Sequence, residues 1–203
     1  MSGRLPLGAR PELDARLVAA LERVGQAARV ALRREARRRG LTPTQAQLLS
    51  RLRSEPAERR RVDVLAAGLD VAHPTVSDAL SALVRKGLVT RGREGPDGRS
   101  PTLHLTPAGE RTADELEAWH DPFLRALAAR PRAEKEPALE FLLALIGRLQ
   151  REGLITVART CTTCRFFRPD LHAGPRPHYC ALLERPLGTG DLRVDCPEHQ
   201  HAA

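Results

Sequence analysis

Leucine, valine and alanine residues return every three or four positions along residues 12–39, and this spacing predicts a long amphipathic helix. The apolar stripe consists of Leu13, Leu17, Leu21, Val24, Ala28 and Leu32. We expect Gly40 to end the helix, after an arginine run that suits the negative end of a helix dipole. A second helix is predicted directly afterwards, because Thr42 can cap it, Pro43 fits its first position and Gln45 completes a capping box.

Residues 63–105 have the pattern of two short helices followed by a hairpin. The first helix is predicted at 63–69 and the second from Pro74 to Gly87, with a tight turn between them. Helix, tight turn and helix at this spacing indicate a helix-turn-helix. Strand-like runs at 88–93 and 102–105 then enclose a segment rich in glycine, proline and aspartate, which is typical of a hairpin. A hairpin in this position is a wing.

Two more helices are predicted at 107–129, with a kink at Pro122, and at 133–152. Together with residues 12–39 they have more apolar surface than a winged domain needs to cover. This excess favours a helical homodimer interface, and the alternative is a monomer whose long helices pack on each other. The predicted fold is mainly α, a winged helix-turn-helix with a two-stranded wing. Its parts are a helical dimerisation region at 12–41 and 107–154, a winged-helix DNA-binding domain at 42–106, and a small four-cysteine module at 155–203.

The chain has a net charge of +8, and residues 161–203 hold only five of the 33 basic residues and five of the 25 acidic ones. The basic excess therefore lies in the first 160 residues, where it suits a polyanion such as DNA. An arginine-rich genome composition is the alternative explanation. The sequence has no apolar run long enough to span a membrane and no signal peptide, so we expect a cytoplasmic protein with no membrane partner. In a reducing cytosol we do not expect structural disulfides.

Polar side chains on the outer face of the second short helix, together with those of the hairpin, are candidates for contact with a duplex. These residues are Thr75, Ser77, Asp78, Ser81, Arg85, Arg91, Arg93, Asp97 and Arg99. Arg85 can reach a phosphate or a guanine, and Arg99 at the hairpin tip suits a narrow minor groove. Asp97 is expected to orient an arginine, because a carboxylate repels phosphate, and Asp78 can only accept from a cytosine. For each residue the alternative is a solvated surface position.

Residues 12–152 resemble the MarR-type family of bacterial transcriptional regulators. The resemblance rests on three segments, LTPTQAQLL (41–49), HPTVSDALSALVRKGLVTR (73–91) and DGRSPTLHLTPAG (97–109). In the last segment, Asp97 and Arg99 match the Asp-x-Arg of the family's wing. The resemblance implies a homodimer built from N- and C-terminal helices, a recognition helix in the major groove and a wing arginine in the minor groove. A two-fold dimer of this kind is expected to bind a palindromic operator on double-stranded DNA.

The chain's four cysteines, Cys161, Cys164, Cys180 and Cys196, lie outside this family pattern in a C-x2-C-x15-C-x15-C arrangement. A segment this short needs a staple or support to fold, so a metal centre on the four cysteines is the favoured interpretation. An iron–sulfur cluster tolerates separated ligands, and the spacing is similar to that of high-potential iron–sulfur proteins. A Zn²⁺ site is the alternative, and free thiols or a dithiol switch are the third. One of the histidines His172, His178 and His199 could replace a ligand.

The predicted function is a sequence-specific DNA-binding transcriptional regulator, a repressor, with redox or metal sensing through the cysteine module as a hypothesis. The alternative is a dithiol or iron–sulfur redox protein without operator specificity. A weakly specific architectural DNA binder is a third interpretation. We predict no enzyme, because the sequence has no catalytic triad pattern, P-loop or dinucleotide-binding fingerprint, and no thioredoxin-like pattern surrounds Cys161 and Cys164.

Overall fold

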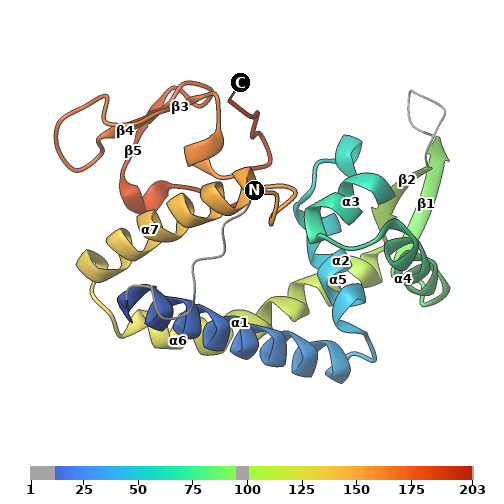
Figure 1. Cartoon of the computed structure of the whole chain (residues 1–203). Coiled ribbons are helices and arrows are strands. Elements are labelled where there is room, and N and C mark those ends of the chain that lie inside the picture. Colours follow the sequence, from blue (N-terminus) through green and yellow to red (C-terminus); the bar gives the residue numbers. More distant parts are fainter. Residues whose placement is uncertain (1–11, 95–100, 203) are drawn as a thin grey trace, which may run out of the picture.

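The computed structural model describes residues 12–94 and 101–202, and helices dominate this part of the chain (Figure 1). The first elements are α1 (Glu12–Arg38), α2 (Pro43–Ser54), the 3₁₀ turn η2 (Ala57–Arg59), α3 (Val62–Leu69), α4 (His73–Arg85) and the strands β1 (Val89–Glu94) and β2 (Pro101–Leu105). The helices α5 (Pro107–Leu116), α6 (Asp121–Ala128) and α7 (Arg132–Arg151) follow, with the 3₁₀ turn η3 (Glu117–His120) between α5 and α6. The last residues form η4 (Cys161–Thr163), β3 (Phe167–Arg168), β4 (His178–Cys180), β5 (Arg185–Leu187) and η5 (Thr189–Asp191).

Local signals in the sequence set the ends of the first helices. The predicted capping box of α2 is confirmed, because Thr42 Oγ1 accepts from the backbone N–H of Gln45 at 3.2 Å and Gln45 Oε1 accepts from that of Thr42 at 3.3 Å. Gly40 and Gly87 have φ angles of +63° and +68°, so they leave α1 and α4 in a left-handed conformation that favours glycine.

One core joins the helix-turn-helix to the hairpin. Its fully buried side chains come from the end of α1, from α2 to α5 and from both strands. The largest are Leu48, Leu49, Leu52, Leu65, Leu80, Leu83, Leu103 and Leu116. The hairpin is antiparallel, and Val89 pairs with Leu105 and Arg91 with Leu103. Val89 and Leu103 are buried, whereas Thr90, Arg91 and His104 are exposed. The predicted winged helix-turn-helix is therefore confirmed as a fold.

The predicted kinked helix at 107–129 is three elements in the structure. Helix α5 ends at Leu116, η3 tightens the chain into a 3₁₀ turn, and α6 begins at Asp121 with Pro122 in its first turn. Proline has no N–H to donate to the preceding turn and its ring crowds the carbonyl four residues before it. The prediction placed the interruption correctly but missed that it separates two helices.

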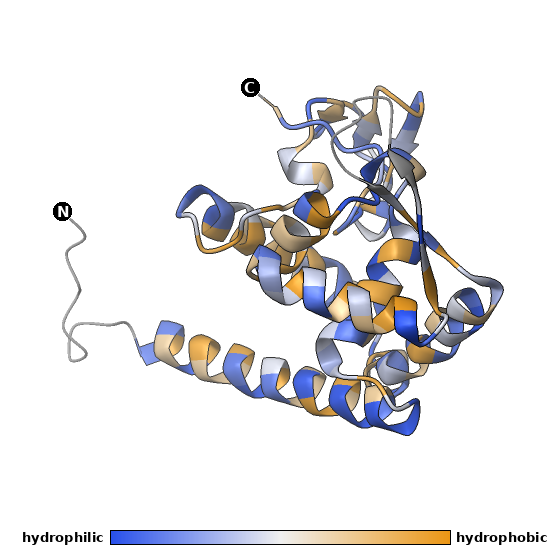
Figure 2. Ribbon diagram, turned by 90° about the vertical axis from the view of Figure 1, so that its right-hand side faces the viewer, coloured by the Kyte–Doolittle hydropathy of each residue, from blue (hydrophilic) through white to orange (hydrophobic). Residues whose placement is uncertain are grey.

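The N-terminal half of α1 stands away from the rest of the chain (Figure 2). Its large apolar side chains are exposed, from 66% for Leu13 to 39% for Leu17 and Leu21. Helices α6 and α7 likewise expose large apolar side chains, namely Leu124, Leu127, Phe141 and Leu142. None of the helices in the described part of the chain combines the length and the apolar composition that crossing a bilayer requires.

Residues 155–202 pack against α7 (Figure 1). Strands β3, β4 and β5 form a small antiparallel sheet in chain order. Leu187 and Leu192 bury themselves against Leu143 of α7, and Cys161, Phe167 and Cys180 lie partly buried beside them. The sheet therefore shares an apolar cluster with α7 and with two of the cysteines.

Two glycines give opposite predictions for replacement by alanine. A Cβ at Gly109, in the first turn of α5, would lie 2.0 Å from the Leu88 carbonyl oxygen. One at Gly147, within α7, would come no closer than 3.5 Å to a neighbouring side chain, the nearest atom being Thr163 Cγ2. Gly109→Ala should lower the free energy of unfolding by about 1–3 kcal/mol, because α5 must move away from the hairpin. Gly147→Ala should raise it by about 0.5–1 kcal/mol, because alanine suits a helix interior.

Urea denaturation of both variants checks this pair of predictions. A Gly109→Ala protein as stable as the wild type would contradict the close packing of α5 on the residue before β1.

Candidate nucleic-acid interface and cysteine pocket

Helix α4 buries one face and exposes the other. Val76, Leu80 and Leu83 are fully buried in the core. Thr75, Asp78 and Arg85 are exposed, and Ser77 is half-buried. The polar residues predicted for DNA contact on this helix therefore lie on its solvent side, and their roles in binding stay predictions.

Arg91 connects the outer face of α4 to the hairpin. Its guanidinium donates to Ser81 Oγ at 2.9 Å, and Ser81 Oγ donates to the Ser77 carbonyl oxygen at 2.9 Å. The Ser81 hydroxyl is thus engaged within the chain, although it was predicted to point outward to DNA. Arg91 is exposed and fixes the base of the hairpin beside α4.

The hairpin tip lies outside the described residues. Asp97 and Arg99, predicted at the tip, fall there, and so does the side chain of Arg93, whose backbone belongs to β1. Their contacts with the groove of a DNA duplex stay predictions.

The N-terminus of α4 also faces solvent. His73, Pro74 and Thr75 are exposed, and the N-cap residue Ala72 has no side chain that could accept from the first N–H groups. A helix N-terminus of this kind attracts phosphate oxygens. His73 was not among the residues predicted for DNA contact, although it lies directly before Pro74 in the first turn of α4.

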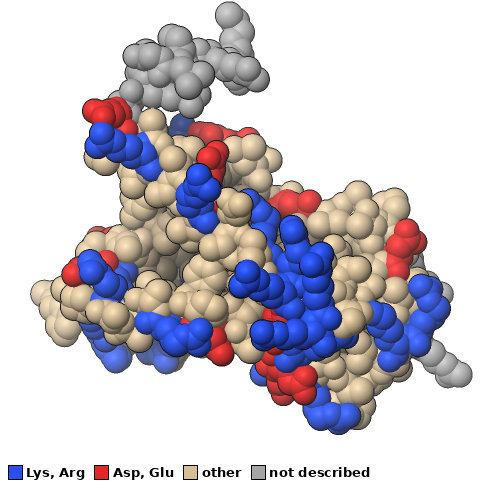
Figure 3. Space-filling model, turned by 90° about the horizontal axis from the view of Figure 1, so that it is seen from below, with Lys and Arg blue, Asp and Glu red and all other residues tan. Residues whose placement is uncertain are grey.

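Basic side chains gather on the face of the molecule seen from below, where α1 runs in Figure 1 (Figure 3). The C-terminal half of α1 supplies the exposed arginines Arg29, Arg33, Arg34, Arg37 and Arg38. This part of the surface adds to the positive potential that would attract a polyanion over distances of about 10 Å at moderate salt.

All four cysteines line one pocket in the C-terminal segment. The pocket has about 470 Å³ of space between atoms, counting the part open to solvent, and Phe167, Leu182 and Leu183 supply apolar wall. The four cysteines are half-buried free thiols. Among the residues described, which include all four cysteines, no three His, Cys, Asp or Glu side chains converge closely enough to hold a single metal ion. The four thiols therefore line a common pocket without converging on a single position.

Arg193 supplies N–H groups to two of the sulfurs. Its backbone N–H donates to Cys161 Sγ at 3.2 Å, and its guanidinium lies 3.5 Å from Cys196 Sγ. Burial raises the pKa of the Cys161 thiol, the hydrogen bond from Arg193 lowers it, and the charges of the three other cysteines raise it further. Cys161 therefore lies close enough to the other three cysteines to feel their charge.

Among the described residues that line this pocket there is no histidine. The His199 ring bonds Thr163 Oγ1 at 2.9 Å, and His178 Nδ1 accepts from the Asp170 backbone N–H at 3.3 Å. His172 packs edge-on against the ring of Tyr179. The three histidines considered as replacement ligands thus have other contacts in this structure.

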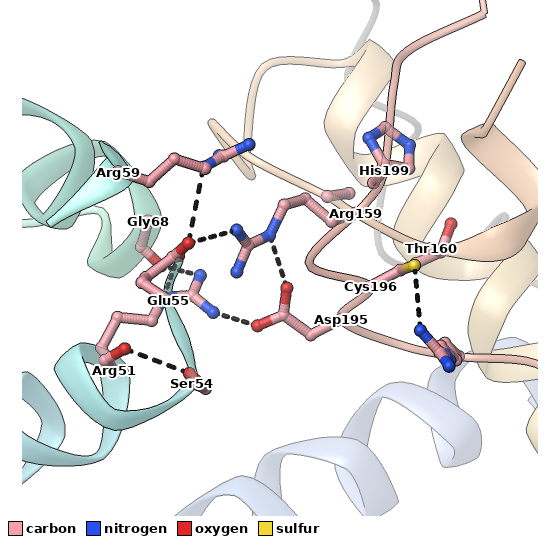
Figure 4. A network of polar contacts seen from close by, with 12 residues as sticks. Arg51, Ser54, Glu55, Arg59, Gly68, Arg159, Thr160, Asp195, Cys196 and His199 are labelled. Atoms are coloured by element: carbon pink, nitrogen blue, oxygen red, sulfur yellow. Dashed lines mark hydrogen bonds and ion pairs between the residues drawn. The ribbon is translucent and has the colours of Figure 1, made fainter. Parts of the chain in front are cut away.

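A partly buried network of charges joins the cysteine segment to the winged helix (Figure 4). Glu55, at the end of α2, has a side chain that is 2% exposed, and Arg159 donates to it at 2.6 Å. Arg159 also donates to Asp195 at 2.6 Å, and Arg51 of α2 pairs with Asp195 from the other side. Although burial opposes its ionisation, the hydrogen bond from Arg159 and the charge of Arg51 hold the pKa of Asp195 below its usual value.

The same network reaches the helix-turn-helix. The Arg51 guanidinium donates to the Gly68 carbonyl oxygen of α3 at 3.2 Å. Asp70, in the turn between α3 and α4, accepts from the Thr156 backbone N–H at 3.0 Å. No local pattern predicts these contacts with the winged helix, because the partners lie 104 and 144 residues apart in the sequence.

Removing Arg159 should destabilise the protein strongly. Arg159→Met leaves Glu55 buried with only the longer contacts to Arg51 and Arg59, at 3.6 and 3.4 Å. We expect a loss of about 3–5 kcal/mol in the free energy of unfolding, as for other broken buried ion pairs. Arg148→Met is the control, because its pair with Glu152 is exposed and should matter by less than about 1 kcal/mol. Equal denaturation midpoints for the two variants would contradict a stabilising role for the network.

Comparisons with known proteins place the helix-turn-helix in a family context. Residues 39–100 match the model of the MarR family. Over 112 residues the chain is 35% identical to the transcriptional regulator MntR of Salmonella typhimurium. The matched segment covers 52% of this chain and 64% of that protein. The chain thus spans less than two thirds of the length of the curated relatives that it matches.

Solved structures of similar fold include a MepR–DNA complex from S. aureus, with a TM-score of 0.56, 21% identity and coverage of 65% of this chain and 96% of that one. They also include the MarR family transcription regulator SP03579, with a TM-score of 0.61, 24% identity and coverage of 70% and 93%. The chain therefore has the mainly helical winged-helix fold of MarR regulators, and its residues 39–100 carry the sequence pattern of that family.

Proposed function

We propose that the protein is a sequence-specific DNA-binding transcriptional regulator that binds an inverted repeat as a homodimer. The observation that carries this proposal is the outer face of α4, where Thr75, Asp78 and Arg85 are exposed beside a hairpin fixed by Arg91. An exposed polar helix of this size fits the major groove, and a neighbouring hairpin reaches the adjacent backbone or minor groove.

Similarity to relatives supports the same proposal. The proteins of similar sequence are described as transcriptional regulators, and one structure of similar fold is a complex with DNA. The positive charge of the first 160 residues and the exposed N-terminus of α4 suit contacts with phosphates.

A second copy of the chain is the partner that the exposed helices fit. Leu13, Val18 and Val24 of α1 are 66%, 52% and 57% exposed, and Leu124 and Leu127 of α6 are 60% and 52% exposed. Covering this exposed apolar surface would stabilise the dimer, and a two-fold partner covers it with the same helices. Two copies of α4 would then face half-sites about one helical turn apart.

Repression is the direction of regulation that this arrangement favours. A dimer lying across an inverted repeat occupies both grooves and excludes other proteins from that stretch of DNA. An activator would also need a surface for the transcription machinery, and α4 with its hairpin is already used for DNA.

Selection of binding sites from random duplexes tests the proposal. The selected sequences should share an inverted repeat, and Thr75→Ala and Arg85→Ala should each weaken binding to it about 5- to 100-fold. Arg148→Ala, on the exposed side of α7, is the control with the same loss of charge. If the protein bound every duplex with equal affinity at about 150 mM salt and enriched no sequence, the operator-specific function would be contradicted. An architectural DNA binder or a redox protein would then remain.

A charge placed on the exposed stripe of α1 should separate the dimer. Leu17→Glu puts a carboxylate where an apolar partner is expected, so the sedimentation coefficient should fall to the value of a monomer at micromolar concentration. Ala19→Glu adds the same charge about half a turn away from the stripe and should leave the dimer intact. A wild-type chain that sediments as a monomer would contradict the proposed assembly.

A further inference from the structure

We propose that the pocket lined by Cys161, Cys164, Cys180 and Cys196 binds a [4Fe–4S] cluster, and that its occupancy controls DNA binding through the Arg159–Asp195–Arg51 contacts. The second half of this inference rests on the proposed regulatory function, whereas the first half does not.

The arrangement of the thiols favours a cluster over a single ion. Four thiolates around zinc lie at the corners of a tetrahedron with Zn–S distances of about 2.3 Å, which leaves no space between them. Here the four cysteines line one pocket, and among the described residues no three ligating side chains converge closely enough to hold a single ion. A cluster with iron and sulfide at the corners of a cube places its four cysteine ligands around such a space.

The surroundings of the sulfurs suit a cluster as well. Hydrogen bonds to sulfur and an apolar shell stabilise thiolates bound to iron. The Arg193 backbone N–H donates to Cys161 Sγ, and Phe167, Leu182 and Leu183 supply apolar wall to the pocket. Strand pairing places Cys180 beside Phe167, in the short strand that follows Cys161 and Cys164.

The loops that carry Cys161 and Cys196 also carry two residues of the charge network, Arg159 and Asp195. The Cys196 backbone N–H donates to the Arg159 carbonyl oxygen at 2.9 Å, and that of Cys161 donates to the Arg193 carbonyl oxygen at 3.0 Å. Arg159 is two residues before Cys161, and Asp195 directly precedes Cys196. A cluster that holds Cys161 and Cys196 therefore holds the two residues that reach Arg51 of α2 and Glu55, which directly follows α2 (Figure 4).

Arg51 passes this constraint to the helix-turn-helix. It contacts Asp195 on one side and the Gly68 carbonyl oxygen of α3 on the other. Without a cluster, the loops of Cys161 and Cys196 keep their backbone hydrogen bonds but lose the link through the iron atoms, so Arg159 and Asp195 are held less firmly. The position of α3, and with it the turn that leads into α4, then loses one of its supports.

The first experiment determines what the pocket binds. Anaerobic, metal-free full-length protein is mixed with a [4Fe–4S] complex of a small thiol, from which each cysteine thiol passes its proton to a departing thiolate as its Fe–S bond forms. The cluster and the cysteine sulfurs keep their oxidation states. We expect four iron and four sulfide per chain and a broad visible absorption band, and Zn²⁺ added alone should not displace them.

Variants separate the ligands from their neighbours. Cys164→Ser and Cys180→Ser should each lose most of the iron and sulfide, whereas His172→Ala and His199→Ala should retain them. A colourless protein that takes up one Zn²⁺ per chain and no cluster would overturn the proposal, as would uptake of neither.

The second experiment measures the coupling. The affinity of cluster-loaded and metal-free protein for a selected duplex should differ by about 5- to 150-fold. Arg51→Met leaves all four cysteines in place, so it should retain its iron and sulfide while this ratio falls toward one. Asp195→Asn is a second variant with the same expectation, in case Arg51→Met folds poorly.

The outcomes distinguish the two proposals. Equal affinities of the loaded and metal-free wild type for a sequence-selected duplex would overturn the coupling and leave the regulator standing. Binding without any sequence preference in both states would overturn the regulatory function, and the iron and sulfide content would still decide whether the pocket holds a cluster.

Discussion

The buried pairing of Glu55 with Arg159 is the interaction on which the arrangement of this chain depends. Both side chains are almost completely buried, at 2% and 4% exposure, and neither charge would tolerate that environment alone. The pair ties a segment with a small apolar core to the end of α2, at the edge of the winged helix. Because Arg159 also contacts Asp195, and Asp195 contacts Arg51, one group of charges fixes the cysteine loops relative to α2 and α3.

Contacts on two sides hold the C-terminal segment in its position between α7 and the helix-turn-helix. Its apolar contacts with α7, through Leu143, Leu187 and Leu192, anchor one side. The charge network and the contact of Thr156 with Asp70 anchor the other side, against the helix-turn-helix. The segment thus touches both the helices that we propose to form the dimer and the unit that we propose to bind DNA. A ligand that orders the cysteine loops could act on both, because it would bind the conformation in which both contacts are made.

Local patterns predicted most of the fold. The capping box at Thr42, the glycines that end α1 and α4, and the alternation that buries Val89 and Leu103 are all encoded within a few residues. Contacts between distant segments left no such pattern. Arg159 and Asp195 look like surface residues in the sequence, and only the folded chain brings them to Glu55 and Arg51. Likewise, Ser81 faces outward by helical periodicity, but its hydroxyl bonds Ser77 and Arg91.

Hydrogen exchange of the anaerobic full-length chain, with and without a bound cluster, tests most directly whether the network carries the state of the pocket to the winged helix. The account predicts slower amide exchange on cluster binding in the cysteine loops and also in α2 and α3, around Arg51 and Gly68. Protection confined to residues 155–202, with unchanged exchange in α2 and α3, would contradict it.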